Sequence, residues 1–307
     1  MSLEIYQIII LISIGALVGT SMSFIGQTGQ GVVVPLILIF SGDVFLAIAI
    51  SVLNDLIAAI AVGINYTRKK QFYFRRDILI LILIAVITAF LGVFILMMTP
   101  LGTVFGWAIP IFIIFLGLAI LRKGFPTSES LQRTVNNIIK RFSRNKSNEI
   151  NNKESQNNFK EPNSVHNEEI QGFIKPYSRL FYILAIILGI FVGINSGMFG
   201  ASSGFIITLV LIILYGYPIK KSVGTALLLS IFMCFFTFSI YQILGFTIKG
   251  QFYYNWEFTL YLGIGSLITG FIVSNYVQKL SAKAMGRGMG ATMIFLGTIS
   301  LIFYFLM

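Results

Sequence analysis

The chain has 307 residues, of which 56% are hydrophobic and 11% are charged, with a mean hydropathy of +0.88 and a net charge of +11. A soluble domain is far more polar, so this composition excludes one and indicates a membrane protein. The basic residues lie in one polar segment and in short loops beside apolar runs, which is typical of membrane topology signals and excludes nucleic acid as a partner.

Eight apolar runs are long enough to be membrane-spanning helices, which need about 20 residues. They cover residues 5–24, 44–64, 78–98, 101–121, 181–199, 222–246, 258–277 and 289–305. The first lacks a basic start and a small-residue cleavage site, so we expect a retained helix and no signal peptide. Two shorter runs, 32–40 and 205–214, reach only about half way across the hydrocarbon core. Pro35 suits the first turns of a helix.

Short strings recur along the chain at fixed distances. Gln-Phe-Tyr-Phe at 71–74 returns as Gln-Phe-Tyr-Tyr at 251–254, and Ile-Phe-Leu-Gly at 114–117 returns at 294–297, both at an offset of 180. Upstream, glycines recur at an offset of 174: Gly15, Gly19 and Gly26 match Gly189, Gly193 and Gly200. We interpret this as a duplication, typical of transporters built from two repeats. The six extra residues fall near 244–250, where we expect a longer loop.

The duplication defines three parts: a first membrane repeat at 1–123, a polar basic segment at 124–178 and a second membrane repeat at 179–307. From Arg122 to Arg179 there are 11 Lys or Arg residues and six Glu residues, with few large apolar side chains. Such a segment cannot bury enough surface to fold alone. The sequence therefore predicts a disordered linker between the repeats.

The positions of the basic residues decide between two topologies. If each short run crosses the membrane, each repeat has five crossings and the second repeat is inverted relative to the first. Five basic residues near 68–76 then share a side with the linker and with Lys220, Lys221, Lys279, Lys283 and Arg287. If the short runs are re-entrant, the repeats are parallel and this grouping is lost. The positive-inside rule favours ten crossings in the cytoplasmic membrane, a cytoplasmic linker and both termini outside.

Each repeat has a polar, glycine-rich break between its first helix and its short apolar run. Unsatisfied backbone costs several kcal/mol per group in hydrocarbon, so such a break at membrane depth must be buried or line a wet cavity. Both breaks lead into a helix N-terminus, which favours an anion. The alternative is an ordinary interfacial turn. The candidate anion-binding residues are Gln27, Thr28, Gly29, Gln30 and Gly31 in the first repeat, and Asn195, Ser202, Ser203 and Gly204 in the second.

Asp55 is the only acid well inside an apolar run, and it follows Asn54. A carboxylate there is costly and usually pairs, takes up a proton or faces water. We consider Asp55, with Asn54, a candidate for proton coupling; the alternative is a hydrogen bond to a neighbouring helix end. Ser51 matches Thr225 at the offset of 174, and both are candidate cavity-facing hydroxyls, although such groups commonly bond back to their own helix.

With these residues in view, the chain resembles the TauE/SafE family, also called the TSUP family of sulfite and sulfonate exporters. The resemblance covers both repeats. It depends on the glycine-spaced helix, the polar break, the short apolar helix, the segment Lys-Ser-Val-Gly-Thr-Ala-Leu-Leu at 221–228 and the basic, then aromatic loop at 68–74. It implies a secondary transporter of small organic or inorganic anions, often sulfur-containing, that is coupled to an ion, with the proton as a candidate, or driven by the membrane potential. Family members have a purer glycine run at the break.

Other classes of function fit the sequence less well. An intramembrane serine hydrolase lacks a partner because the only histidine, His166, lies in the linker, and an aspartyl protease would need a second intramembrane acid. Cys234 is the only cysteine, which excludes a disulfide framework and a Cys-Cys metal pair. We expect no enzyme activity, no cofactor and no metal. An anion channel or a membrane scaffold subunit stays open, and glycine-spaced faces allow close contact within or between subunits.

Overall fold

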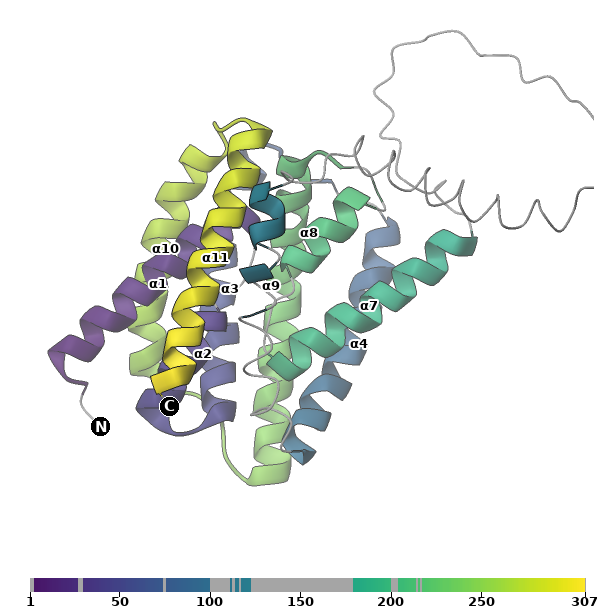
Figure 1. Ribbon diagram of the computed structural model, residues 1–307. Coiled ribbons are helices and arrows are strands. Elements are labelled where there is room, and N and C mark those ends of the chain that lie inside the picture. Colours follow the sequence, from purple (N-terminus) through teal and green to yellow (C-terminus); the bar gives the residue numbers. More distant parts are fainter. Residues whose placement is uncertain are drawn as a thin grey trace, which may run out of the picture.

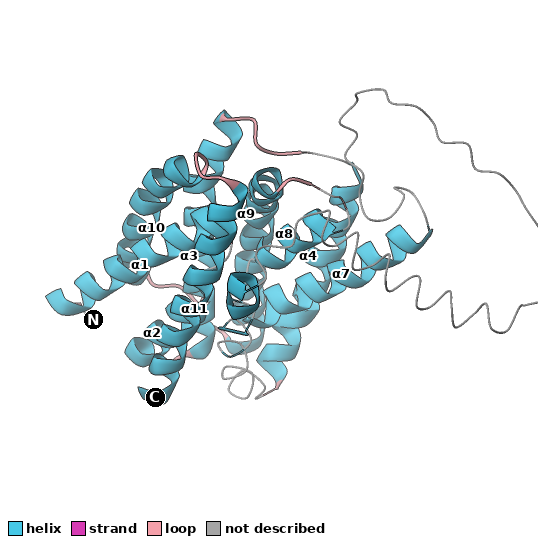
Figure 2. Cartoon of the chain, turned by 45° about the horizontal axis from the view of Figure 1, so that its top comes forward, coloured by secondary structure: helices cyan, strands magenta, loops and turns pink. Residues whose placement is uncertain are grey.

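The computed structural model describes residues 3–26, 30–73, 76–99, 111, 114–115, 117–122, 179–199, 204–213, 215 and 217–306. These residues form helices and short connections, with no strand among them (Figure 2). The longer helices are α1 (Ile5–Ile25), α3 (Val44–Arg68), α4 (Arg76–Met98), α7 (Arg179–Phe199), α9 (Ile219–Leu244), α10 (Trp256–Val277) and α11 (Ala282–Leu306). The short ones are α2 (Gln30–Ser41) and α8 (Gly204–Ile213).

Within this described part, six helices are long and apolar enough to cross a membrane. All six agree with apolar runs in the sequence: 5–24, 44–68, 78–98, 219–249, 256–277 and 283–303. The structure therefore confirms an all-helical multi-pass membrane protein. The linker lies outside the described residues, as does most of the run at 101–121.

The first helix of each half packs against a helix from the other half. α1 makes its largest contact with α10, and α7 makes its largest contact with α4 (Figure 1). Small residues allow both contacts: a Cβ at Gly265 would lie 2.2 Å from the Ile12 carbonyl oxygen, and one at Gly193 would lie 2.2 Å from that of Ala85. Without a hydrophobic force between helices in lipid, this close backbone approach is the main source of attraction.

Replacing Gly265 by alanine is expected to destabilise the fold, because the added methyl group cannot avoid the Ile12 carbonyl without moving the helices apart. Overpacking of this kind costs about 1–3 kcal/mol. The measurement is the melting temperature of the purified protein in detergent. The matched control is Gly63→Ala, whose nearest new contact, Ile231 Cδ1, lies at an ordinary 3.5 Å. Equal losses in the two variants would contradict the packing argument.

The middle of the molecule is formed by α3 and α9, which pack against each other and carry the short helices. α2 packs on α3, and α8 packs on α9. Both central helices are largely buried, with fully buried polar residues among their side chains. In α2, which begins at Gln30, Pro35 lies in the second turn, within the early part of the helix as expected. Proline has no N–H, so the Gly31 carbonyl receives no helical bond from it.

The extra residues of the second half extend a helix. The sequence predicts a longer loop at 244–250, and this is wrong: a π-helical turn, Gly245–Lys249, continues α9. The continuous helix Ile219–Lys249 has 31 residues, whereas its counterpart Val44–Arg68 has 25. The difference of six residues equals the change from an offset of 174 to one of 180. Isolated π turns of this kind accommodate extra residues without ending a helix.

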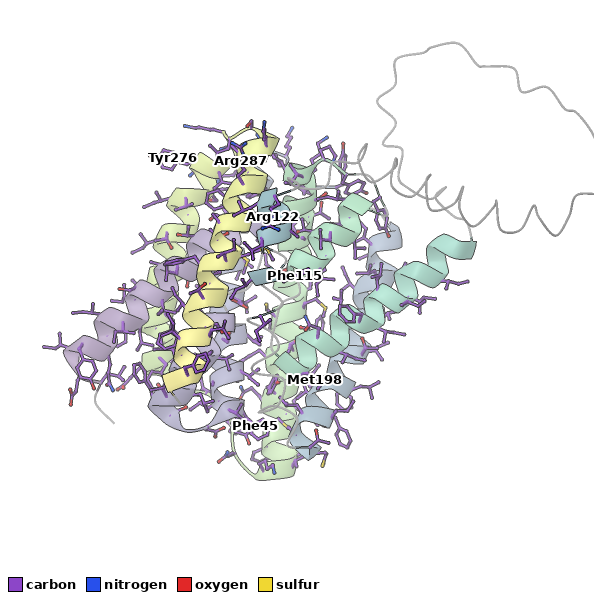
Figure 3. All side chains as sticks on the ribbon, viewed as in Figure 1. Phe45, Phe115, Arg122, Met198, Tyr276 and Arg287 are labelled. Atoms are coloured by element: carbon purple, nitrogen blue, oxygen red, sulfur yellow. The ribbon has the colours of Figure 1, made fainter. Side chains whose placement is uncertain are left out.

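The two ends of the molecule differ in charge. Lys220 Nζ donates to the Gln278 carbonyl oxygen at 2.8 Å, and Lys221 Nζ donates to the Tyr73 hydroxyl, so the start of α9 lies beside the end of α10 and the 68–76 connection. Tyr276 and Arg287 lie at this end, and Phe45 lies at the other, where both termini are found (Figures 1 and 3). The basic clusters at 68–70, 220–221 and 279–287 thus share one end.

Candidate functional site

The end of α1 contacts the start of α8 near the middle of the molecule. Gly26 ends α1 in the left-handed conformation, with φ 64° and ψ 20°. A Cβ at Gly204, the first residue of α8, would lie 1.8 Å from the Gly26 carbonyl oxygen. The two backbones are therefore in direct contact, which only a glycine at position 204 allows. The two polar breaks border these residues, at 27–29 and 200–203.

Ser230 of α9 lies beside this contact. Its Oγ is 2.8 Å from the position that a Gly204 Cβ would occupy, and the side chain is fully buried. Within the described part of the chain, this hydroxyl has no hydrogen-bond partner. Thr208 Oγ1, one turn further along α8, lies 3.7 Å from a Cβ at Gly26. A buried hydroxyl without a partner costs about 1–3 kcal/mol, so a ligand that accepts a hydrogen bond from Ser230 would recover that energy.

A second group of buried polar residues lies on α3. Ser51, Asn54 and Asp55 have no exposed surface. The side-chain oxygen of Asn54, Oδ1, accepts a hydrogen bond from Ser266 Oγ of α10 at 2.7 Å. The Asn54 side-chain nitrogen, Nδ2, and Ser51 Oγ have no hydrogen-bond partner among the described residues. Two uncharged hydrogen-bond donors, Ser51 Oγ and Asn54 Nδ2, therefore lie within about one helical turn of Asp55, the candidate coupling residue.

The hydroxyl group of Thr225 makes hydrogen bonds within the protein that hold a connecting segment against α9. Its Oγ1 donates to the Lys221 carbonyl oxygen at 2.7 Å, as threonines in helices commonly do, and it accepts from the Tyr73 backbone N–H at 2.9 Å. A Cβ at Gly224 would lie 1.8 Å from the Gln71 carbonyl oxygen. The segment 71–73 therefore lies directly on the first turns of α9, and Thr225 holds it there.

The structure describes some of the predicted site residues. Gly204, Ser51, Asn54 and Asp55 are buried, Gly31 and Asn195 are half-buried, and the backbone of Gln30 begins α2. Five other candidates lie outside the described residues: Gln27, Thr28, Gly29, Ser202 and Ser203. Within the described part, no group of three or more His, Cys, Asp and Glu residues could hold a metal ion.

A comparison with protein families gives one match. The family described as sulfite exporter TauE/SafE matches residues 11–299, nearly the whole chain. The chain belongs to the TauE/SafE family. A TauE/SafE chain is a membrane transport protein, and the resemblance inferred from the sequence is thereby confirmed. Comparisons with curated proteins and with solved structures found no significant match.

Sequence reasoning missed Ser230 of this TauE/SafE protein. The duplication gave no signal for it, because the offset of 174 pairs Ser230 with Leu56. Only the fold locates it: Leu227 and Val223 lie 3.8 Å from a Cβ at Gly26, which places α9 against the end of α1. Ser230 follows Leu227 by three residues and so lies on the same helical face.

Replacing Thr225 by valine is expected to destabilise the protein by about 1 kcal/mol, because valine keeps the shape but leaves the Tyr73 N–H without its acceptor. The melting temperature in detergent measures this loss, and limited proteolysis at the 68–76 connection measures local opening. Thr225→Ser retains the hydroxyl and should stay close to the parent protein. A valine variant as stable and as resistant to protease as the serine variant would contradict this role.

Proposed function

We propose that this protein is a secondary transporter, an exporter of small organic or inorganic anions such as sulfite or sulfonates, and that it binds the anion between the two helix breaks. The observation that carries this proposal is the direct contact between Gly26 at the end of α1 and Gly204 at the start of α8. Gly26 and Gly204 are described residues that flank the two breaks, so this contact supports a site that both breaks share. The N-terminus of α8 also points a helix dipole at this place, which favours negative charge.

The chemistry of the surrounding residues supports an anion that is held without a fixed positive charge. The described lysines and arginines lie in the end turns of helices or in the connections between them, whereas Ser230 offers an uncharged donor at the contact. Neutral donors and helix dipoles bind an anion more weakly than a lysine or an arginine would. Weak binding suits a carrier, which must release its substrate on the other side.

The packing supports two inverted repeats around this site. Under the offsets found in the sequence, α1 corresponds to α7 and α4 corresponds to α10, so the α1–α10 contact and the α7–α4 contact are counterparts. A two-fold relation in the membrane plane would exchange the two contacts. We propose that the end with the basic clusters is cytoplasmic, with the linker, and that both termini lie outside.

Flux into proteoliposomes tests the proposal. The purified protein is reconstituted, and uptake of sulfite, sulfonates and small carboxylates is measured with and without a proton gradient, with protein-free liposomes as the control. A carrier should show saturable uptake and should exchange internal for external anion. Saturation without exchange would favour a channel. The absence of flux for every anion under every gradient would favour a scaffold and overturn the proposal.

A further inference from the structure

Each central helix carries a buried tyrosine whose hydroxyl reaches the end of the first helix in the same half. Tyr66 of α3 donates to the Ser23 backbone carbonyl oxygen at 3.2 Å, and Tyr241 of α9 donates to the Gly197 backbone carbonyl oxygen at 2.7 Å. The two side chains are 1% and 0% exposed. α3 and α9 stand between α1 on one side and α7 on the other, so each is placed to reach a helix that precedes a break (Figure 1).

The two carbonyl groups hold equivalent positions. Ser23 and Gly197 are each two residues from the end of their helix, since α1 ends at Ile25 and α7 ends at Phe199. An α-helical bond to either carbonyl would need the N–H group four residues further on, which lies beyond the end of the helix. The last carbonyl groups of a helix need a partner from elsewhere, and hydrocarbon offers none. Each tyrosine hydroxyl supplies that partner.

Each of these helix ends is also fixed by a second helix. Ser23 Oγ donates to the Gly270 carbonyl oxygen of α10 at 3.3 Å. A Cβ at Gly197 would lie 2.2 Å from the Ala89 carbonyl oxygen of α4, so the two backbones touch there. α4 and α10 are counterparts under the offset of 180. In both halves, therefore, the last turn ahead of the break is packed against a counterpart helix and bound by a tyrosine of a central helix.

The bond is repeated although the two tyrosines are not aligned. Ser23 and Gly197 are 174 residues apart, as the duplication requires. Tyr66 and Tyr241 are 175 residues apart, and the aligned counterpart of Tyr66 is Ile240. A tyrosine that only fills the core would be expected to keep its register. Its shift by one residue, with the bond from hydroxyl to carbonyl present in both halves, indicates that the bond is the feature both halves need.

We propose that Tyr66 and Tyr241 are positioning residues for the anion site, an inference that rests on the proposed function. Each hydroxyl fixes the end of the helix ahead of one break and thereby the place where that break begins. Tyr66 acts three residues ahead of Gly26, whose carbonyl oxygen contacts Gly204. Tyr241 acts ahead of the break at 200–203, which leads into Gly204. Both hydroxyls are committed to the backbone, so they act on the anion through the breaks and not by direct contact.

Hydrogen–deuterium exchange of tyrosine-to-phenylalanine variants tests whether the hydroxyls hold the helix ends. Phenylalanine keeps the ring and its packing but removes the donor. In Tyr66→Phe, amides at 19–26 should exchange about two- to tenfold faster, because one hydrogen bond is lost and the helix end opens more often. Tyr241→Phe should have the same effect at 192–199. Each variant should leave the other helix end unchanged. Tyr217→Phe, which removes an equally buried hydroxyl just ahead of α9, should change neither.

Anion uptake into proteoliposomes tests whether the hydroxyls position the site. The probe is the best transported of sulfite, sulfonates and small carboxylates. Tyr66→Phe and Tyr241→Phe should each raise its KM by about two- to tenfold with little change in the maximal rate, because a displaced break weakens anion binding throughout the cycle. A role in folding alone would lower the amount of active protein, which reduces the maximal rate and leaves KM unchanged. Tyr217→Phe again serves as the control.

The outcomes separate this inference from the proposed function. Exchange that is unchanged at the matching helix end, or that rises equally at both ends in each variant, would overturn the inference. Faster local exchange with an unchanged KM would also overturn it, because the tyrosines would then stabilise helix ends without positioning the site. A parent protein that transports none of the anions would overturn the proposed function, and exchange would still decide whether the hydroxyls hold the helix ends. If one variant does not fold, the other tests the inference in its own half.

Discussion

Replacing Gly204 by alanine is expected to lower transport by about tenfold or more. The new methyl group would lie 1.8 Å from the Gly26 carbonyl oxygen and 2.8 Å from Ser230 Oγ. Because the first of these is backbone, no change of rotamer relieves the overlap, and α8 must move away from the end of α1. A barrier raised by about 1.4 kcal/mol is enough for a tenfold loss of rate. The measurement is anion uptake into proteoliposomes per unit of folded protein.

The Gly265→Ala variant provides the matched control for this experiment. It introduces an overlap of the same kind, with the Ile12 carbonyl oxygen at 2.2 Å, but at the α1–α10 contact. Both variants should therefore lose stability, whereas only Gly204→Ala should lose transport in the protein that remains folded. Equal transport by the two folded variants would mean that the Gly26–Gly204 contact is packing alone, and the proposed site would have to be sought elsewhere.

The helices could be predicted from the sequence, whereas their partners could not. Apolar runs of spanning length identify α3, α4 and α10 because the hydrocarbon core fixes how long such a run must be. The glycine spacing in α1 indicates a close contact, but it is equally compatible with a contact inside the chain or between subunits. In the structure the contact is inside the chain, because Gly15 and Gly19 lie against α10. That choice depends on distant parts of the sequence.

The candidate site was predictable only in outline, for the same reason. Glycine at position 204 signals a break, but its neighbour Gly26 is remote in sequence and is brought close by the fold. Thr225 and Ser51 occupy equivalent positions in the two halves, yet only Thr225 binds the backbone of a connecting segment. The two halves differ because the segment 71–73 lies on the start of α9. Internal symmetry therefore predicts positions better than it predicts roles.

Replacing Asp55 by asparagine is expected to uncouple transport from the proton gradient. Asp55 is fully buried in the middle of α3, where a charged carboxylate costs about 2.5–3.5 kcal/mol. A carboxyl group avoids that cost when it binds a proton. If it binds the proton on one side of the membrane and releases it on the other, the movement of the proton is coupled to transport. Asparagine keeps the size and the hydrogen-bonding capacity but cannot exchange a proton. We therefore expect proton-driven net uptake to fall about tenfold, with counterflow of labelled anion retained.

The comparison of the two fluxes separates coupling from other roles of Asp55. Counterflow needs binding and the conformational change but no net proton movement, so an uncoupled carrier still performs it. Loss of both fluxes would assign Asp55 to folding or to anion binding, and wild-type values for both would exclude a coupling role. Asp55→Glu, which retains the carboxyl group, should preserve a dependence on the proton gradient.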